Sequence, residues 1–276
     1  MAGRARPPVG HARGLMAAAL VTGASRKVGI AAAVARALAA AGWDVATTCW
    51  RPYDEGEPWG SRDEEAEELV AQLRGLGVRA ALHEDDLADA AAPARVLAAA
   101  EEGVGPLTAL VNVHAHSELG GLLETTAEQF DRHVTVNARA TLLLAAEFVR
   151  RFRGEHGSGR IVNFTSGLPL HGEIAYAASK GAVEWLTVSA AVELGPRGIT
   201  VNAIDPGPTD TGWLSPELHS AVEDATPLGR VGRPEDAAEL VVFLCSPAGR
   251  WITGQVLHSD GGFAWVRTRR RGRDAE

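Results

Sequence analysis

The chain has 276 residues, a formal net charge of −8 and two cysteines, Cys49 and Cys245. Its length suits one large α/β domain or two small ones, and its negative charge argues against general binding to nucleic acid or to anionic membranes. Two cysteines exclude a disulfide framework, and no apolar run reaches the length of a membrane span, so we expect a cytoplasmic protein.

Both ends of the chain are basic. Residues 1–15 combine arginine with proline and glycine, and residues 264–276 are rich in arginine. Such compositions are typical of solvated, disordered tails. Between them, over residues 16–263, no linker or internal repeat divides the chain, so we expect a single domain.

The first expected strand leads into a turn that contains glycine. Residues 17–21 are apolar, the turn covers residues 22–30, and an alanine-rich helical pattern follows over residues 31–41. Glycine lets the backbone approach a pyrophosphate, and the amino terminus of a helix offers free N–H groups. A strand, a glycine turn and a helix in this order predict a dinucleotide site. The cofactor contacts expected in this turn are Gly23, Ser25, Arg26, Lys27, Gly29 and Ile30.

Strands and helices continue to alternate along the chain. Further strands are expected at residues 44–49, 79–83, 107–113, 160–165, 199–205 and 255–258. Helices are expected at about residues 64–73, 93–102, 124–150 and 234–245, with another that carries Tyr176 and ends near residue 194. Residues 50–63 are expected to form a polar loop. The alternation predicts a Rossmann-type α/β fold, a doubly wound parallel sheet of about seven strands with helices on both faces.

Tyr176 and Lys180 are candidates for catalysis. Four residues apart, they lie one turn from each other on the same face of a helix. A phenol titrates at about pH 10 in water, and a neighbouring ammonium lowers that pKa. Ser166 offers a hydroxyl to the same substrate oxygen, so the set predicts proton transfer at a carbonyl or alcohol oxygen. Taken alone, such a pair is more often solvent-exposed, but lysine occurs only here and at Lys27.

The end of the second expected strand bears on the choice of cofactor. A site that selects NAD places a carboxylate about 20 residues beyond the glycine turn, where it holds the ribose 2′-hydroxyl. Counting from Gly29 reaches Cys49, and residues 47–51 contain no acid. Asp44 lies at the opposite end of this strand, and Asp54 lies beyond it in the expected loop.

Two arginines are the expected contacts in place of that carboxylate. Arg26 and Arg51 can converge on the 2′-phosphate of NADPH, with Lys27 close behind, and a guanidinium matches phosphate oxygens with two parallel hydrogen bonds. We therefore expect NADPH or NADP+ rather than NADH. In the alternative, both arginines are solvated loop residues.

These motifs resemble those of the classical short-chain dehydrogenase/reductases over about residues 17–263, in particular the subgroup similar to 3-oxoacyl-carrier-protein reductases. The family's glycine motif falls on Thr22, Gly23 and Gly29, and its late Asp-Gly-Gly signature falls on residues 260–262. The catalytic residues that the resemblance implies are Asn137, Ser166, Tyr176 and Lys180. The further cofactor contacts expected with it are Asp86, Leu87, Asn112, Tyr176, Lys180, Pro206, Gly207, Thr209 and Thr211.

The chain departs from the family pattern at three places. Lys27 stands where the motif has its middle glycine, which requires a backbone angle that lysine tolerates and brings a cation near the phosphates. Residues 112–115 replace the family's Asn-Asn-Ala-Gly motif. The loop between Ser166 and Tyr176 is shorter than the family usually has, which leaves the substrate class open and makes Thr165 an alternative catalytic hydroxyl.

Histidines and large apolar residues flank the expected cleft. His114 and His116 have no acidic or cysteine partner at metal-ligand spacing, so we expect no metal and expect both rings to line the cofactor cleft. Trp213 and Leu214 either cap an apolar substrate or form a packed lid. The aromatic residues expected to pack an inserted loop over the adenosine end are Trp50, Tyr53 and Trp59.

The resemblance implies an NADPH-dependent carbonyl reductase that acts on a small-molecule ketone, such as a 3-oxoacyl or polyketide intermediate. Tyr176 would give the proton, Ser166 would hydrogen-bond the carbonyl oxygen, and Asn137 would keep a water in the relay. Lys180 would lower the pKa of Tyr176 and hold the nicotinamide ribose. The alternatives are an NAD-dependent alcohol or sugar dehydrogenase and a non-catalytic, cofactor-sensing protein of the same fold.

We also expect a homotetramer. Relatives assemble through the helices that carry Asn137 and Tyr176 and through the region around the last strand. The residues that make the second helix apolar on more than one side, as packing against a partner requires, are Val183, Leu186, Val188 and Leu194.

Overall fold

The structure is a computed structural model that describes residues 17–57, 60, 62, 64–166 and 172–263. The two expected tails, Trp59 and most of the loop between Ser166 and Tyr176 lie outside these residues. No helix in the described part of the chain is both long enough and apolar enough to cross a membrane.

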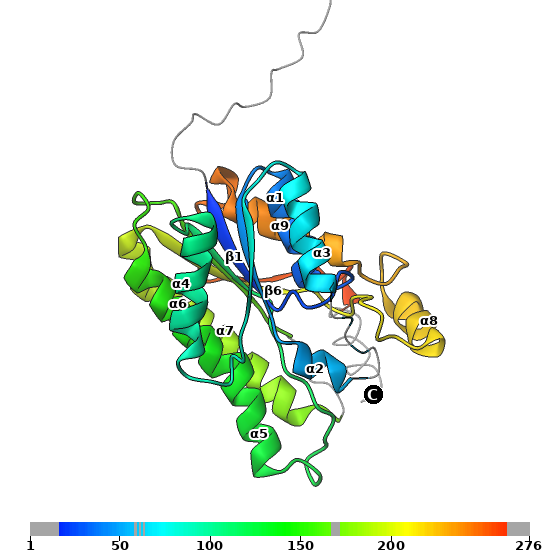
Figure 1. Ribbon diagram of the computed structural model, residues 1–276. Coiled ribbons are helices and arrows are strands. Elements are labelled where there is room, and N and C mark those ends of the chain that lie inside the picture. Colours follow the sequence, from blue (N-terminus) through cyan, green and yellow to red (C-terminus); the bar gives the residue numbers. More distant parts are fainter. Residues whose placement is uncertain (1–16, 58–59, 61, 63, 167–171, 264–276) are drawn as a thin grey trace, which may run out of the picture.

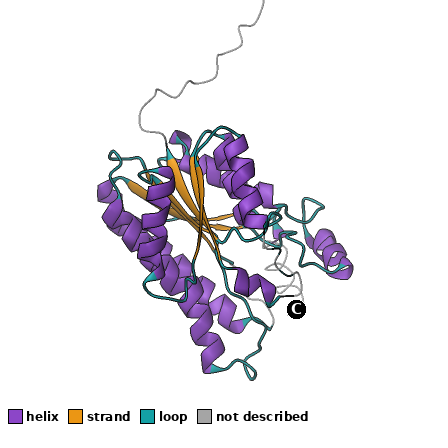
Figure 2. Ribbon diagram, viewed as in Figure 1, coloured by secondary structure: helices purple, strands orange, loops and turns teal. Residues whose placement is uncertain are grey.

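Seven parallel strands form one sheet, which confirms the predicted fold (Figures 1 and 2). The strands are β1 (Ala18–Thr22), β2 (Asp44–Cys49), β3 (Ala80–Glu84), β4 (Ala109–Asn112), β5 (Gly159–Phe164), β6 (Ile199–Asp205) and β7 (Val256–His258). Their spatial order is β3-β2-β1-β4-β5-β6-β7, so the direction of winding reverses between β1 and β4. Open parallel sheets bind ligands beyond the carboxyl ends of their strands at such a reversal.

Helices cover both faces of the sheet (Figure 1). The helices of one face are α1 (Ile30–Ala40), α3 (Glu65–Gly75) and α9 (Pro234–Cys245). Those of the other face are α4 (Ala92–Val104), α6 (Ala140–Arg151) and α7 (Ile174–Leu194), and short 3₁₀ turns follow α7 and α9 at Gly195–Arg197 and Pro247–Gly249. Every residue of β1 and β2 is buried, which explains why these strands are not alternately polar and apolar.

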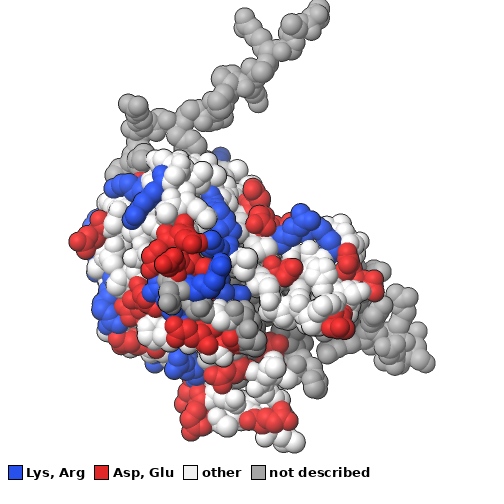
Figure 3. Space-filling model, turned by 45° about the vertical axis from the view of Figure 1, so that its right-hand side comes forward, with Lys and Arg blue, Asp and Glu red and all other residues white. Residues whose placement is uncertain are grey.

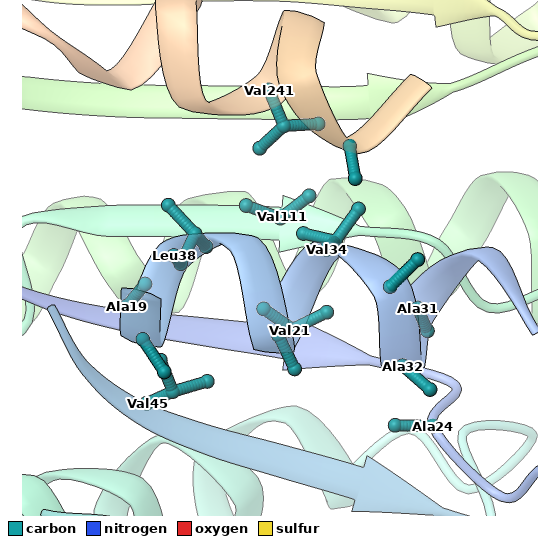
Figure 4. Close-up of a cluster of buried hydrophobic side chains, with 14 of the residues drawn as sticks. Ala19, Val21, Ala24, Ala31, Ala32, Val34, Leu38, Val45, Val111 and Val241 are labelled. Atoms are coloured by element: carbon teal, nitrogen blue, oxygen red, sulfur yellow. The ribbon is translucent and has the colours of Figure 1, made fainter. Parts of the chain in front are cut away.

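The packing of α1 fixes the turn that precedes it. Val34 and Leu38 of α1 are fully buried among Val21 of β1, Val111 of β4 and Val241 of α9 (Figure 4). Burial of such side chains contributes about 1.5–3 kcal/mol each. Because α1 begins directly after the glycine turn, this packing holds the turn at the carboxyl end of β1.

The single helix expected over residues 124–150 is interrupted. The structure has α5 (Ala127–His133), a π-helical turn (Val134–Arg139) and then α6. The carbonyl of Asn137 in the wide turn accepts a hydrogen bond from the Thr141 hydroxyl at 2.7 Å. Turns of this kind often occur at functional sites, and the apolar pattern of the sequence does not distinguish them from an α-helix.

Two short helices fall in segments where no helix is expected from the sequence. They are α2 (Arg51–Glu55), inside the expected polar loop, and α8 (Pro216–Ala225). Both have a proline in the first turn, where the missing N–H removes no helix hydrogen bond. The expectation of a loop throughout residues 50–63 is therefore wrong, because residues 51–55 form α2.

Candidate active site

A cleft of about 330 Å³ opens at the carboxyl ends of the strands. The predicted site residues that line it are Gly23, Ser25, Arg26, Gly29, Ile30, Asp86, Leu87, Tyr176, Lys180, Pro206 and Thr211. Those outside its lining are Lys27, Arg51, Asn112, Asn137, Ser166, Gly207 and Thr209. Lining residues that are not expected at the site from the sequence include Asp54, Asp85 and Arg132.

The glycine turn has the form that a bound phosphate needs. Gly23 has φ +81°, and a methyl group added there would lie 2.7 Å from the Cα of His114, so only glycine fits. Gly29 precedes α1, whose first turn has no acidic residue and no side-chain cap. The first N–H groups of α1 and the positive end of its dipole are therefore available to an anion.

His114 joins the glycine turn to the π-helical turn. Its Nε2 lies 3.1 Å from the carbonyl of Val136 and donates to it, so its Nδ1 accepts from the Thr22 hydroxyl at 2.7 Å. Burial, with a smaller contribution from the charge of Lys180, lowers the pKa of His114 to about 3. The ring is therefore neutral and is fixed in one tautomer. His114 and His116 line the cleft, as expected from the sequence.

Asn137 holds the segment after β4 against α7. Its Oδ1 accepts from the N–H of His116 at 2.7 Å, and its Nδ2 donates to the carbonyl of the same residue at 2.9 Å. Nδ2 also lies 2.9 Å from the hydroxyl of Ser179. These contacts make Asn137 a positioning residue, and its expected part in holding a water stays a prediction.

Tyr176 and Lys180 face the cleft together, as their spacing predicts. The Lys180 ammonium lies 5.7 Å from the centre of the Tyr176 ring and donates to the carbonyl of Phe164 at 3.0 Å. Burial lowers the pKa of Lys180 to about 8. Burial also raises the pKa of Tyr176 above its ordinary value, and nearby acidic groups, Glu173 first among them, raise it further.

The expectation that Lys180 lowers the pKa of Tyr176 is therefore not met in this structure. Burial of the phenol is the largest cause of the raised pKa, and the ammonium, 5.7 Å from the ring centre, does not reverse it. As a consequence, the phenol of Tyr176 is neutral at physiological pH and carries a proton that it can donate.

The hydroxyl of Thr165 contacts two residues of α7. It lies 3.1 Å from the carbonyl of Lys180 and 3.1 Å from a carboxylate oxygen of Glu184, and the side chain is buried. Ser166 follows it and is half-buried. The contacts of the Thr165 hydroxyl favour Ser166 as the catalytic hydroxyl, whereas the lining of the cleft includes Thr165 and not Ser166, so the catalytic role of Ser166 stays a prediction.

Arg26 spans the cleft between two of its walls. Its Nη1 donates to the carbonyl of Thr211 at 2.9 Å, and its Nε lies 3.3 Å from a carboxylate oxygen of Asp54. Asp54 is on α2, is 6% exposed and lines the cleft. The expectation that Asp54 lies in a loop beyond β2 is therefore wrong, because this segment forms α2 and turns back toward the glycine turn.

Lys27 and Arg51 do not reach the cleft. The Lys27 ammonium pairs with Glu68, and the Arg51 guanidinium pairs with Glu67 and Glu84. The expected convergence of Arg51 with Arg26 is thus absent, because acids on α3 and β3 hold it elsewhere. Figure 3 shows the same close mixing of acidic and basic side chains over one face of the molecule. Lys27 is also not strained, since no described residue other than glycine has a positive φ.

The chain resembles known oxidoreductases over most of its length. The family model described as enoyl-(acyl carrier protein) reductase matches residues 23–264. The chain belongs to the short-chain dehydrogenase/reductase family. The uncharacterised oxidoreductase YjdA of Bacillus subtilis is 41% identical over 249 residues, which cover 89% of this chain and 96% of that protein.

Two similar solved structures contain a dinucleotide. A blue fluorescent protein from a metagenomic library, in complex with NADPH, has a TM-score of 0.80 and 35% identity and covers 90% of this chain and 98% of its own. A short-chain dehydrogenase from Burkholderia cenocepacia, in complex with NADP, has a TM-score of 0.79 and 37% identity and covers 89% and 97%. This short-chain dehydrogenase/reductase is an NAD(P)-dependent oxidoreductase that acts on CH–OH or C=O groups.

Three predicted residues of this short-chain dehydrogenase/reductase lie behind the lining of the cleft. Asn112 is buried, and its Nδ2 donates to Asn163 at 2.9 Å. A methyl group added at Gly207 would lie 2.5 Å from the Cβ of Asp260, so the turn after β6 packs closely against the Asp-Gly-Gly signature. The Thr209 hydroxyl lies 3.2 Å from the carbonyl of Gly207. In this structure these residues shape the walls of the cleft, and their expected contact with the cofactor stays a prediction.

Two of the three aromatic residues expected to pack over the adenosine end, Trp50 and Tyr53, line the cleft, and their packing over the cofactor stays a prediction. The Tyr53 hydroxyl lies 3.3 Å from the carbonyl of Ser117, and its ring centre lies 5.4 Å from that of His116. Tyr53 thus contacts the segment after β4 that Asn137 also holds. Among the described residues, no group of three histidine, cysteine, aspartate or glutamate side chains is arranged to hold a metal.

The two residues proposed as a cap have different environments. Trp213 lines the cleft, is 47% exposed and donates from its indole nitrogen to the carbonyl of Thr209 at 2.9 Å. Leu214 packs against Val222, Val231 and Phe263 in a small separate cluster. Leu214 is therefore part of a packed lid, whereas Trp213 is placed to contact a ligand.

Proposed function

We propose that this short-chain dehydrogenase/reductase is an NADPH-dependent carbonyl reductase that acts on a small-molecule ketone. The observation that carries the proposal is the neutral phenol of Tyr176 at the wall of the cleft, one helical turn from the buried ammonium of Lys180. A reductase needs a proton donor where the substrate oxygen gains negative charge. Ketones of the 3-oxoacyl or polyketide kind remain the substrate class that the family resemblance suggests.

The residues of the cleft suit a nicotinamide dinucleotide. Gly23 and the amino terminus of α1 would hold the pyrophosphate, Arg26 would hold the 2′-phosphate, and Lys180 would hold the nicotinamide ribose. When bound, NADPH supplies the hydride. Two relatives of similar structure are complexes with NADPH or NADP, which supports this choice.

The pKa values of Tyr176 and Lys180 indicate which of the two side chains gives the proton to the substrate. The Tyr176 hydroxyl gives its proton to the oxygen of the substrate as the carbonyl carbon is reduced. The Ser166 hydroxyl donates a hydrogen bond to the same oxygen and holds it in place. Lys180, with a pKa of about 8, is mostly charged at neutral pH and stabilises the phenolate that remains. Proton transfer of this kind contributes about 10²–10⁴-fold to the rate.

A second candidate is an NAD-dependent alcohol or sugar dehydrogenase. The specific observation that favours it is the carboxylate of Asp54 in the cleft, because an acid near the end of β2 accepts a hydrogen bond from the 2′-hydroxyl of NAD. A cofactor-sensing protein without turnover is the remaining alternative, although a sensor has no need of the combined Asn137, Ser166, Tyr176 and Lys180 set.

The test is the oxidation of NADPH and of NADH by the purified protein with a panel of β-keto esters, cyclic ketones and aromatic ketones. We expect NADPH oxidation that depends on the ketone. Faster oxidation of alcohols with NAD+ would favour the second candidate. Dinucleotide binding without turnover of any ketone or alcohol would favour the sensor.

We further propose a homotetramer in the cytoplasm, with α6 and α7 at the subunit contact. Of the four residues expected to make α7 apolar on more than one side, Val183 and Leu194 are buried in the protein's own core, whereas Val188 is exposed. In their place, Trp185 and Val192 of α7 are 75% and 78% exposed, and Leu142 of α6 is exposed too. Exposed apolar residues on adjacent helices fit a partner's surface. The cytoplasmic location is supported by the two cysteines, which are both free and buried.

A further inference from the structure

The short helix α2 is held in place at three points. Asp54 pairs with Arg26 of the glycine turn, the Tyr53 hydroxyl contacts the backbone of Ser117, and Arg51 pairs with Glu84 and Glu67. The helix lies beyond the carboxyl ends of the strands (Figure 1). Because its ends and its middle are all anchored, the carboxylate of Asp54 has a defined position in the cleft.

That position is close to the end of β2. Asp54 lines the same cleft as Thr48 and Cys49, the last residues of this strand. Burial raises the pKa of the Cys49 thiol to about 12, and the neighbouring carboxylates, including Asp54, add to the shift. The thiol therefore lies within the electrostatic reach of Asp54. Strand β2 has no acidic residue at this end. Helix α2, a few residues further along the chain, supplies Asp54.

A carboxylate and a guanidinium at this place have opposite preferences. The carboxylate accepts a hydrogen bond from the ribose 2′-hydroxyl of NAD and repels the 2′-phosphate of NADP, whereas an arginine binds that phosphate. Here the two groups are also in contact with each other, with the Nε of Arg26 3.3 Å from Asp54. A 2′-phosphate would have to compete with Asp54 for the guanidinium.

We infer that Asp54 is a cofactor-selecting residue, which weakens binding of the 2′-phosphate of NADP+ and strengthens binding of the 2′-hydroxyl of NAD+. The inference rests on the proposed function, since it concerns the same dinucleotide site. It means that the preference for NADPH is set by a balance between Arg26 and Asp54, and that the inserted helix α2 can shift it without any change in β2.

A purely structural role for the pair makes a different prediction. If Asp54 only anchors α2, its loss loosens one wall of the cleft and weakens NADP+ and NAD+ to the same extent. If Asp54 selects the cofactor, its loss tightens NADP+ and weakens NAD+. The ratio of the two dissociation constants separates the two roles and needs no substrate and no turnover.

The experiment is titration calorimetry of NADP+ and NAD+ with the full-length protein and its D54N and E55Q variants. Glu55 is the next residue of α2 and is exposed, so E55Q makes the same change of charge outside the cleft. In D54N we expect the ratio Kd(NAD+)/Kd(NADP+) to rise at least about tenfold, equivalent to about 1.4 kcal/mol. In E55Q we expect it to stay within about twofold. A second neutral variant, D54S, must shift the ratio in the same direction and replaces D54N if that variant does not fold.

The outcomes separate the inference from the proposed function. A ratio in folded D54N or D54S that stays within about twofold of wild type overturns the inference alone, as does an equal shift in E55Q. A wild-type protein that binds neither dinucleotide overturns the proposed function and the inference with it. Tighter binding of NADP+ and weaker binding of NAD+ by D54N, with both dissociation constants unchanged in E55Q, support the inference and the proposed function.

Discussion

Lys180 is predicted to make the protein less stable than a neutral residue at the same place would. It is buried, and its pKa falls from 10.5 to about 8. At about 1.36 kcal/mol per unit, keeping this ammonium charged at neutral pH costs the folded state about 3 kcal/mol. Replacing it with methionine removes this cost but also removes the hydrogen bond to the carbonyl of Phe164, and leaving a buried carbonyl without a partner costs about 1–3 kcal/mol.

Lys180→Met is therefore expected to stabilise the fold by up to about 2 kcal/mol at pH 7 while abolishing turnover. For a domain of this size, each kcal/mol raises the melting temperature by about 2–4 °C. The assay is thermal unfolding of wild type, Lys180→Met and Lys27→Met at equal protein concentration. Lys27 is the chain's other lysine, its ion pair with Glu68 is at the surface, and its replacement is expected to change stability by less than about 1 kcal/mol.

The pH dependence of this difference checks its cause. The pKa of Lys180 is lower in the folded than in the unfolded state, so the cost is fully present below about pH 8 and disappears as pH rises from about 8 toward 10.5. The advantage of Lys180→Met must therefore shrink over this range. The reasoning is refuted if Lys180→Met is less stable than wild type at pH 7, or if its advantage is the same at pH 7 and pH 10.

Three further predictions concern the reaction and the assembly. The value of kcat/KM for ketone reduction should fall as pH rises through about 8, because Lys180 then loses its charge; a rise over that range would contradict the assigned role. Ser166→Ala should lose at least about 10-fold more activity than Thr165→Ala, and the reverse order in steady-state kinetics would move the catalytic hydroxyl to Thr165. Wild type should be a tetramer by light scattering at micromolar concentration, and Trp185→Asp, on the exposed face of α7, should dissociate it; a monomeric wild type would exclude this assembly.

The features that could be predicted from the sequence are those that depend on local spacing. Strands β2 and β6 have the expected bounds, because an apolar run between turn residues marks a buried strand. The common helical face of Tyr176 and Lys180 follows from their separation of four residues. The lining role of Gly23 and Arg26 follows from the strand, turn and helix around them.

The features that could not be predicted depend on partners distant in the sequence. Arg51 is held by Glu67 and Glu84, and nothing in its own neighbourhood distinguishes those acids from a phosphate. Asp54 enters the cleft because α2 folds back toward Arg26, which the composition of the inserted segment does not reveal. The raised pKa of Tyr176 comes from burial, and its spacing from Lys180 predicts the opposite sign.

Tyr176 is proposed to give the proton to a ketone oxygen. This role is tested most directly by the ketone-dependent oxidation of NADPH in Tyr176→Phe, with the binding of NADPH measured in the same preparation. Phenylalanine keeps the ring and removes the proton, so we predict a loss of at least about 10²-fold in kcat, with the dissociation constant of NADPH within a few-fold of wild type. Retention of most of the wild-type rate by Tyr176→Phe would contradict the account.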